Sequence, residues 1–338
     1  MSQPVITIIG SLNADLITRT SRIPSPGETL NSSSFSIGCG GKGANQAVAC
    51  ARLSRTRESS LSKTIEHGND NAPKTIIVRM EGAVGSDIFG QNLIETLGRD
   101  GIDISGVQTR GDENTGVAVI LVEEGSGENR ILLSPGANAT LRPESFSSLA
   151  APIPDLLILQ LEIPLVTVLA ILRAAAACIP PVSVLFNPAP ATALPPWAYS
   201  LVEHLIVNET EAAALYGASE EYICSNLSRV GREFQNRGAR NVVMTLGKAG
   251  SWFVSGSLDD GAGPGGEEGQ MAAVKADVVD TTAAGDTFVG AYAVSVVQQK
   301  KGGKRFDIRS AVEWANRAAA RAVEKEGAMG SIPWMDEI

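Results

Sequence analysis

The sequence predicts an α/β fold, a three-layer sandwich with a mostly parallel central sheet, together with a small separate β-sheet. From residue 155 onward, short apolar segments of strand length alternate with segments of helical period, as in βαβ units whose sheet is covered on both faces. Two hairpin-like excursions, within about 13–38 and 114–134, do not fit that alternation and predict the small sheet. The 338 residues suffice for one such domain spanning 1–338.

The first half of the chain is expected to combine strands with two helices. Its apolar, β-branched runs are bounded by Gly, Pro, Asn and Ser, which is typical of strands and turns. Helix 44–53 is opened by a glycine-rich turn, and helix 87–99 by Asp87 as an N-cap. Residues 54–74 are polar and aperiodic, which predicts a surface insertion. The expected strands are 5–10, 16–20, 33–37, 75–80, 117–122 and 130–133.

The second half carries the regular strand–helix alternation. Its strands are short and almost continuously apolar, as strands buried on both faces of a sheet are. An acidic, glycine-rich segment at 259–269 is expected to be a flexible loop. The expected strands are 156–159, 182–186, 204–207, 242–246 and 274–279. The expected helices are 164–177, 209–216, 221–237, 284–299 and 308–326.

The charge balance and the apolar segments exclude two classes of partner. The formal net charge is −9, so no global basic field is present to bind a nucleic-acid backbone or an anionic membrane. The apolar region at 156–186 is interrupted by charged residues and prolines and cannot cross a bilayer as one helix. Residues 5–9 form a short apolar run without a basic lead, which predicts a strand and not a signal peptide.

Cysteine and histidine usage narrows the chemistry further. The four cysteines are widely separated and form no Cys-x-x-Cys pair, which is typical of small buried side chains in a reducing compartment. We therefore expect a cytoplasmic protein, with the nucleus as a further compartment. The two histidines, His67 and His204, have no partner at metal-ligand or Ser-His spacing. Any acid–base chemistry is therefore expected to use a carboxylate.

Residues 280–286, Asp-Thr-Thr-Ala-Ala-Gly-Asp, carry the sharpest chemical signal. An expected strand ends at Val279, small residues follow, and a helix begins near Ala284. Small residues leave backbone N–H groups accessible at the positive end of the helix dipole, which predicts an anion site. Asp286 lies beside that site in the first helical turn, and Asp280 adds a second carboxylate at a strand end, where active sites collect. Asp286 is thus a catalytic candidate, with a plain helix cap as the alternative.

Residues 38–43 read Gly-Cys-Gly-Gly-Lys-Gly and match the G-x-G-x-x-G pattern of dinucleotide-binding folds. The strand before them belongs to a hairpin excursion, however, and the acidic ribose-binding residue would be Glu58, inside the expected insertion. The Walker A pattern fails as well, because Ser36 and Gly43 stand where it needs Gly and Ser or Thr. A dinucleotide site and a tight helix-entry turn both remain open.

Three further segments follow expected strands, and each allows two interpretations. Residues 208–211, Asn-Glu-Thr-Glu, suit magnesium held through water or a helix capping box. Residues 245–250 place Lys248 in a glycine turn, which suits a nucleotide phosphate or a hairpin. Asn13 and Asp15 follow the first strand and suit vicinal sugar hydroxyls or an Asx turn.

Taken in order, these segments resemble the ribokinase branch of the carbohydrate kinase family that also holds fructokinases and adenosine kinases. The resemblance runs from about Val5 to Pro333. The chain departs from the pattern at Ala283, where the wider family has Gly but an alanine suits ribokinases. The 54–74 insertion and an enlarged 255–270 loop are extra. The segments that carry the resemblance are 10–15, 40–47, 187–191, 208–211 and 280–286.

The resemblance implies roles for individual residues, with Asp286 as the catalytic base. The anion hole would comprise Ala283, Ala284 and Gly285. The sugar site would comprise Asn13, Ala14, Asp15, Gly41, Lys42, Gly43, Ala44, Asn45, Glu162 and Asp286. The ATP site would comprise Asn208, Thr245, Leu246, Gly247, Lys248, Ala249, Gly250, Gly285, Asp286 and Asn316. A potassium site, built partly from backbone carbonyls, would comprise Asp280, Thr282, Ala322, Lys325, Gly327 and Ser331. Glu211 would organise magnesium through water.

The resemblance also implies the activity, which is ATP-dependent phosphorylation of D-ribose at O5 to ribose 5-phosphate, with Mg²⁺ accompanying ATP and K⁺ as an activating cation. The hairpin strands would form a lid over the sugar, and a sheet that small is expected to pack on a second copy as a homodimer. A kinase for another furanose sugar or a nucleoside, such as fructose or adenosine, is the alternative within the class. Alternatives of other classes are a dehydrogenase and a sugar-binding regulator without catalysis, although a regulator would be expected to lack the base or the anion hole.

Overall fold

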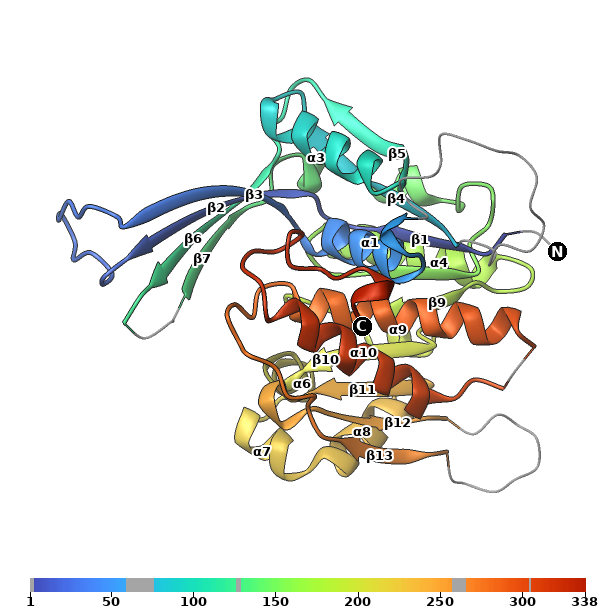
Figure 1. The fold of residues 1–338 in the computed structure, drawn as a ribbon. Helices are drawn as coiled ribbons and strands as arrows, with labels where there is room; N and C mark the ends of the chain where they lie inside the picture. Colours follow the sequence, from blue (N-terminus) through green and yellow to red (C-terminus); the bar gives the residue numbers. More distant parts are fainter. Residues whose placement is uncertain (1–2, 59–75, 126–128, 257–265, 304) are drawn as a thin grey trace.

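The computed structural model has the expected three-layer α/β architecture, with a small second sheet projecting from one end (Figure 1). It describes residues 3–58, 76–125, 129–256, 266–303 and 305–338. The strands of the central sheet are β1 (Val5–Ile9), β4 (Ile77–Gly85), β5 (Asp103–Arg110), β8 (Leu156–Leu159), β9 (Ser183–Phe186), β10 (His204–Asn208), β11 (Asn241–Thr245), β12 (Ser251–Val254) and β13 (Glu268–Met271). They lie in the order β13-β12-β11-β10-β9-β8-β1-β4-β5. Among these described strands β12 alone runs against the others, since both of its neighbours pair with it in the antiparallel sense.

The central strands are apolar on both faces because helices cover both. On β1, Ile6 and Ile8 pack into one core, while Ile9 packs into the other, as the alternation of side chains along a strand requires. One helical layer holds α1 (Lys42–Leu53), α3 (Ile88–Arg99), α9 (Ala284–Lys301) and α10 (Ile308–Ala322). The other holds α4 (Leu165–Ala177), α5 (Pro196–Tyr199), α6 (Glu209–Tyr216), α7 (Glu220–Ser225) and α8 (Leu227–Asn236). None of the described helices has the length and apolarity that a membrane span requires.

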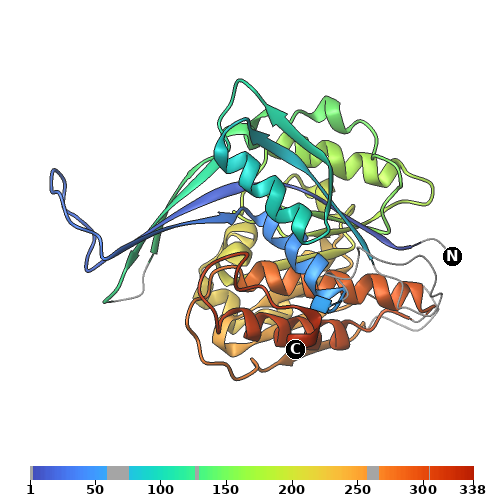
Figure 2. The ribbon, with the colours of Figure 1, turned by 45° about the horizontal axis from the view of Figure 1, so that its top comes forward.

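The second sheet begins where the central sheet ends. Its strands are β2 (Asn13–Thr20), β3 (Ser34–Gly40), β6 (Gly116–Glu123) and β7 (Asn129–Ser134), in the order β3-β2-β6-β7. Asn13 follows β1 after three residues and pairs with both Gly40 and Gly116. The base of the small sheet is therefore fixed at the carboxyl end of β1, and the rest extends away from the body (Figure 2).

Some elements differ from the sequence-based expectation. The strand expected at 274–279 is wrong, because residues 272–278 form no strand and β13 at 268–271 is the edge of the sheet instead. Part of the loop expected at 259–269 is therefore a strand, and its residues 257–265 lie outside the described part. The helix expected at 221–237 is two helices, broken at Asn226, whose backbone is not helical. Strands β5 and β12 were not expected.

The prediction that residues 54–74 form a surface insertion is wrong for the first residues of that segment. Residues 59–74 lie outside the described part of the chain. Arg55, however, is buried, and its guanidinium donates to the carbonyls of Ala51 and Asp100 at 2.9 and 2.6 Å. The first residues of the segment therefore belong to the packed fold, because a buried cation needs acceptors that the end of α1 and the end of α3 supply.

Candidate active site

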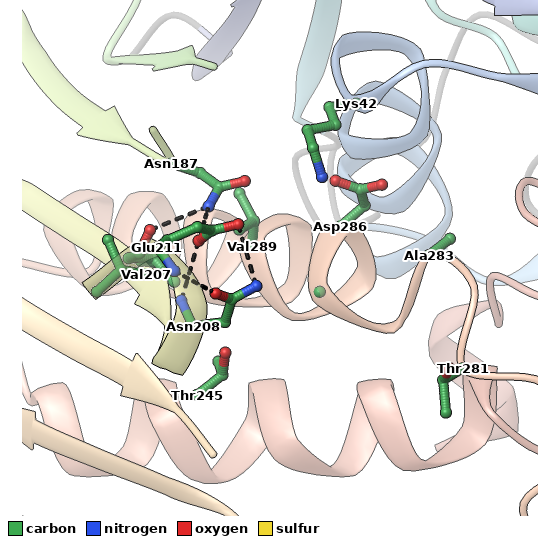
Figure 3. A pocket seen from close by; sticks show the side chains of 12 residues that line it. Lys42, Asn187, Val207, Asn208, Glu211, Thr245, Thr281, Ala283, Asp286 and Val289 are labelled. Carbon is green, nitrogen blue, oxygen red and sulfur yellow. Dashed lines mark hydrogen bonds between the residues drawn. The ribbon is translucent and has the colours of Figure 1, made fainter. Parts of the chain in front are cut away.

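A cavity of about 210 Å³ lies at the carboxyl ends of β9, β10 and β11 and faces the first turn of α9 (Figure 3). Parallel sheets commonly bind ligands at this edge, because loops from several strands converge there. The residues that line it are Lys42, Asn187, Ile206, Val207, Asn208, Glu211, Thr245, Thr281, Ala283, Gly285, Asp286 and Val289. The structure thus brings together residues expected for the sugar, for the nucleotide and for catalysis.

The first turn of α9 forms one wall of the cavity. Ala283 is its N-cap and has a left-handed backbone (φ 59°, ψ 8°), which an L-residue adopts at a cost. The N–H of Ala284 donates to the carbonyl of Thr281 at 3.3 Å. A Cβ added at Gly285 would meet nothing within 4 Å. Since the first N–H groups of a helix have no intrahelical acceptor, the turn exposes backbone donors toward the cavity, where an anion can approach.

Asp286 lies buried in this first turn. Its Oδ2 accepts a hydrogen bond from Asn45 Nδ2 and its Oδ1 accepts one from Gln46 Nε2, each at 2.9 Å. The ammonium of Lys42 points toward the same carboxylate (Figure 3). Burial raises the pKa of Asp286, and the charge of Lys42 and the two amide donors oppose that rise. Helix α9 has no side-chain cap, so the carboxylate is held by α1 and is not the cap of its own helix.

Two further carboxylates, Asp15 and Glu162, converge beside Asp286. Oε2 of Glu162 accepts from the hydroxyl of Ser11 at 2.6 Å, from the backbone N–H of Lys42 at 3.0 Å and from Asn13 Nδ2 at 3.4 Å. Burial, followed by the charges of Glu162 and Asp286, raises the pKa of Asp15 to about 7. Asn13 lies in β2, and its amide bonds to Glu162 and Asn138, so the Asx-turn interpretation is wrong for this residue. The group offers acceptors and donors suited to a ligand rich in hydroxyls.

Close packing explains the glycine pattern at 38–43. A Cβ added at Gly40 would lie 2.0 Å from Oδ2 of Asp15. One added at Gly43 would lie 2.7 Å from the carbonyl carbon of Gly10. Both distances are far shorter than a carbon atom tolerates, so only glycine fits where β3 ends beside β2 and where α1 begins beside the end of β1. Close packing thus accounts for Gly40 and Gly43 without a dinucleotide, whereas a Cβ at Gly38 would meet nothing within 4 Å.

Glu211 is both a capping residue and a candidate partner of magnesium. It forms a capping box with Asn208 at the start of α6. Its Oε2 accepts from the N–H of Asn208 and from Asn187 Nδ2, whereas Oε1 accepts only from Asn208 Nδ2. Each carboxylate oxygen can accept two hydrogen bonds, so one position on Oε1 stays open. Burial raises the pKa of Glu211, against the hydrogen bond from Asn208. This arrangement fits one metal-bound water better than direct ligation.

The segment 245–250 is a hairpin turn, as one of the two interpretations predicted. Thr245 ends β11 and lines the cavity, whereas residues 247–249 form an exposed turn that leads into the antiparallel strand β12. Leu246 is buried. Asn316 of α10 donates to the hydroxyl of Ser251 at 2.9 Å, directly after the turn. Thr245 therefore faces the cavity, and the remaining expected nucleotide residues of this segment lie along the turn beyond it.

Asp280 joins the loop before α9 to the C-terminal segment. Its Oδ1 accepts from the N–H and the hydroxyl of Thr282 at 2.9 and 2.6 Å, and its Oδ2 accepts from the N–H of Gly327 at 3.0 Å. Burial opposes ionisation, but these hydrogen bonds outweigh it and lower the pKa of Asp280. The carboxylate therefore stays negative, with one acceptor position left on Oδ2.

The other residues expected around potassium lie in the following turns. The N–H of Lys325 donates to the carbonyl of Ala322 at 3.2 Å. The ammonium of Lys325 is 3.4 Å from a carboxylate oxygen of Glu337, so only its backbone can face a cation. The hydroxyl of Ser331 is buried and donates to the carbonyl of Ala328 at 2.8 Å. Oxygen atoms predominate in this set, which fits a large monovalent cation.

His204 lies at the amino end of β10, whereas the cavity lies at the carboxyl ends of the strands. Its Nδ1 is 3.0 Å from the hydroxyl of Tyr292. Burial lowers its pKa to about 4, so the ring is neutral near neutral pH and packs within the core. His67 lies outside the described residues.

Comparison with known proteins identifies the family. Residues 4–335 match the pfkB family of carbohydrate kinases. The chain belongs to this family. Among pfkB-family relatives, a ribokinase of Schizosaccharomyces pombe is 38% identical over 98% of this chain and 96% of its own length. The predicted family is confirmed.

Solved pfkB-family structures share the fold. A ribokinase from Cryptococcus neoformans in complex with ADP has a TM-score of 0.76 at 31% identity, covering 99% of this chain and 98% of that one. The ribokinase of Arabidopsis thaliana complexed with ribose and ATP has a TM-score of 0.76 at 27% identity, covering 99% and 97%. The expected three-layer fold with its second sheet is confirmed as well.

Several residues in and around this pfkB-family site were not predicted, among them Thr281, which lines the cavity, and a set of buried polar side chains. Ser11, Gln46 and Asn187 lie inside the motifs that carried the resemblance, so attention to every polar residue of those motifs could have found them. Asn138, which lies in a short 3-10 helix, donates to Oδ1 of Asn13 at 2.8 Å. No sequence motif contains Asn138. Gln160 follows β8 within an apolar run, where a buried amide has no periodic signal.

Proposed function

We propose that this chain is an ATP-dependent sugar kinase that phosphorylates D-ribose at O5, giving ribose 5-phosphate and ADP. It is a phosphotransferase with an alcohol group as acceptor. The observation that carries the proposal is Asp286, a buried carboxylate held by two amide donors in the first turn of a helix whose N-terminus faces the cavity. Similarity to relatives named as ribokinases supports ribose as the sugar.

The sugar is proposed to lie on the side of Asp286 where Asp15 and Glu162 converge. Ionised carboxylates accept hydrogen bonds from hydroxyls, and such charge-assisted bonds are the stronger kind. Hydrogen bonds to Asn138 and Glu162 fix the orientation of the Asn13 amide. The amide can therefore hydrogen-bond a sugar hydroxyl in one defined geometry. The proposed sugar-binding residues are Asn13, Ala14, Asp15, Gly41, Lys42, Gly43, Ala44, Asn45, Glu162 and Asp286.

The nucleotide is proposed to lie on the side of Asn208 and Glu211. Backbone donors at Gly285 and the turn after β11 border that side. Gly285 and Asp286 lie between the proposed sugar and the proposed nucleotide, so these two residues border both substrates. The proposed ATP-binding residues are Asn208, Thr245, Leu246, Gly247, Lys248, Ala249, Gly250, Gly285, Asp286 and Asn316.

The proposed mechanism uses Asp286 as a general base. A sugar hydroxyl is a weak nucleophile near neutral pH, so a base must accept its proton as it attacks. Asp286 accepts the proton of the O5 hydroxyl while O5 bonds to the γ-phosphorus and the bond from that phosphorus to ADP breaks. Of the proposed anion hole, the backbone N–H groups of Ala283 and Gly285 stabilise the charge on the transferred group, and that of Ala284 would first have to leave the carbonyl of Thr281, to which it donates at 3.3 Å. Glu211 would hold Mg²⁺ through a water, and the ion, supplied with ATP, would neutralise phosphate charge.

A monovalent cation, potassium, is proposed to bind beside Asp280. The carboxylate is negative and accepts from the hydroxyl of Thr282 and the N–H of Gly327, while the backbone N–H of Asp280 donates to the carbonyl of Val323. Binding would order the loop that leads into α9, so turnover should be faster in potassium chloride than in sodium chloride. Equal rates in the two salts at equal ionic strength would rule the site out as an activator.

The small sheet is proposed to be a lid over the sugar and the contact surface of a homodimer, with residues 1–338 acting as one catalytic domain. By strand register, Ile37, Leu16, Val119 and Leu132 form one apolar row across its four strands. Ile37 and Leu132 are 56% and 68% exposed at the two ends of that row. If the small sheets of two copies packed face to face, they would bury this apolar row. A single isolated sheet leaves the row open to solvent.

The alternatives differ in substrate or in class. A related kinase could act on fructose or adenosine, and a non-catalytic sugar-binding regulator would release no ADP. A coupled assay of ADP release decides among them, with ribose, other pentoses, fructose and adenosine each offered with MgATP. We expect ribose to give the highest kcat/KM, and absence of ribose-dependent ADP release would overturn the proposal.

The proposed compartment is the cytoplasm, with the nucleus as a further one. All four cysteines are free thiols, as is usual in a reducing compartment. Fluorescence microscopy of a tagged full-length chain would test this localisation.

A further inference from the structure

Gln46 lies at the centre of a chain of buried amides. Its Nε2 donates to Oδ1 of Asp286 at 2.9 Å and to Oδ1 of Asn187 at 3.1 Å. Its Oε1 accepts from Nε2 of Gln160 at 2.7 Å. Gln46 is 0% exposed and Gln160 is 1% exposed. Both N–H groups and the oxygen of the Gln46 amide are therefore used, and bulk water cannot replace any of the three partners.

The neighbours fix the direction of this amide. Nδ2 of Asn187 donates to the carbonyl of Ile206 at 3.0 Å and to Oε2 of Glu211 at 3.4 Å. Oδ1 of Asn187 is thus the atom that faces Gln46. If the Gln46 amide were flipped, its oxygen would face both this oxygen and the Asp286 carboxylate, which is repulsive. In the observed orientation every polar atom of the Gln46 amide has a partner, and Gln46 donates to Asp286.

We propose that Gln46 is a positioning residue for the transfer reaction, which holds the Asp286 carboxylate in one orientation and ties it to Asn187 and Glu211 on the nucleotide side. The inference rests on the proposed kinase function. Gln46 lies beneath Asp286 and does not line the cavity, so it acts through Asp286 and not on the substrates. A misdirected carboxylate would accept the hydroxyl proton poorly even where both substrates bind well.

The charges around Asp286 define what the loss of Gln46 should change. Lys42, Glu162, Glu211 and Asp15 all interact with this carboxylate electrostatically. These four groups remain when Gln46 is replaced. A donor to an ionised carboxylate favours the ionised form, so its removal should raise the pKa of Asp286. The acidic limb of the pH profile of kcat should then move to higher pH.

The test is Gln46→Met, which keeps the length of the side chain and removes both N–H donors. We expect kcat to fall roughly 10–100-fold while KM for ribose and for ATP stays within about threefold, because positioning acts on the transition state. The acidic limb of kcat should shift upward by roughly one pH unit. Steady-state ADP release from pH 5 to 9, with thermal unfolding as a check of the fold, measures all of these.

Thr167→Val is the matched control. Thr167 is 0% exposed, and its hydroxyl donates to the carbonyl of Leu141 at 2.8 Å on the opposite helical layer. This variant loses a buried hydrogen bond without touching the amide chain, so kcat and its pH profile should stay unchanged. If Gln46→Met lowers kcat no more than the control, or leaves the acidic limb in place, the positioning role is wrong.

A second variant covers the case in which Gln46→Met does not fold. Gln160→Met leaves both donors of Gln46 in place and removes only the group that holds its oxygen. We expect a smaller fall in kcat and a smaller upward shift of the acidic limb, because the donors of Gln46 remain but its amide is less firmly oriented. An unmoved limb together with an unchanged kcat would overturn the proposal. Failure of the proposed function itself is distinguishable, because the unmodified chain would then release no ADP with ribose.

Discussion

At the scale of single residues, the ionisation of Asp15 makes the stability of the fold depend on pH. Burial, followed by the charges of Glu162 and Asp286, raises its pKa to about 7, whereas an unfolded chain has about 3.9. Between those pH values the folded protein binds the proton more tightly than the unfolded chain. The folded state therefore loses stability as the pH rises from about 4 to about 7, and the loss is complete above that range.

We expect Asp15→Asn to stabilise the protein at pH 8 and to change little at pH 4. The amide removes the buried repulsion, and the gain at pH 8 should be about 2–4 kcal/mol. KM for ribose should rise in the same variant, because the amide is a weaker acceptor for hydroxyls. Thermal unfolding at both pH values measures the effect. A gain of equal size at the two pH values would show that the charge of Asp15 is not its cause.

Residues differ in how far the sequence could reveal them. Asp286 lies in a motif whose small neighbours at a strand–helix boundary point to an anion site, so its place at the cavity was predictable, whereas Lys42 was assigned only through the family resemblance. Asn138 could not be found in this way. It reaches Asn13 only because β2 and β6 pair in register and the 3-10 helix after β7 folds back. A contact made by tertiary folding leaves no local pattern.

At the scale of elements, α1 connects the candidate active site to the C-terminal segment. Near its start, Asn45 and Gln46 hold Asp286. Near its end, Nη1 of Arg52 donates to the carbonyls of Met329 and Ile332 at 2.7 and 2.9 Å. The same guanidinium pairs with Asp100 at 2.9 Å, with both side chains largely buried. One helix thus fixes two distant segments against each other.

We expect Arg52→Met to lower the free energy of unfolding by about 3–5 kcal/mol, since it leaves Asp100 buried without its cation. Arg99→Met is the matched control, because Arg99 is 74% exposed and pairs with Glu95 on the surface of α3. The control should cost at most about 0.5 kcal/mol. Urea unfolding followed by circular dichroism measures both. Equal losses in the two variants would mean that Arg52 does not anchor the segment.

The mispredicted strands between residues 268 and 279 share one physical cause. Residues 274–279 are rich in valine and read as a strand, yet no strand lies beside them to pair with. β13 reads Glu-Gly-Gln-Met, a poor strand sequence, and is a strand because it pairs with β12. Strand formation depends on a partner more than on intrinsic preference, so sheet edges are where sequence patterns are least informative.

At the scale of the whole molecule, the three-layer fold was predictable from the sequence. The association of two copies remains a prediction. Buried strands between amphipathic helices define the layers by periodicity alone. The small sheet is different, because Ile37 and Leu132 are exposed at the two ends of its apolar row with Leu16 and Val119, and we expect a second copy to cover that row.

We expect the chain to sediment as a dimer at micromolar concentration and Leu132→Asp to sediment as a monomer. A charge in the row would have to be buried in the dimer, which is unfavourable. Ile179→Asp is the control, because Ile179 is 100% exposed and lies outside the small sheet. A monomeric unmodified chain, or dissociation by the control as well, would contradict the proposed contact.

The whole account depends on Asp286 as the base, and Asp286→Asn tests it with little change in shape. Oδ1 of Asn45 is buried and has no hydrogen-bond partner among the described residues. If the amide of Asn45 turns over, this oxygen can accept from the new amide at position 286. The variant should therefore fold and bind both substrates, and only the proton acceptor is lost.

The decisive measurement pairs the kcat of Asp286→Asn with calorimetric binding of ribose and ATP to the same variant. Loss of a general base removes roughly 10²–10⁴-fold of rate. We predict a fall in kcat of at least about 100-fold with both substrates still bound. A variant that binds both and keeps kcat within about tenfold of the unmodified chain would show that Asp286 is not the base.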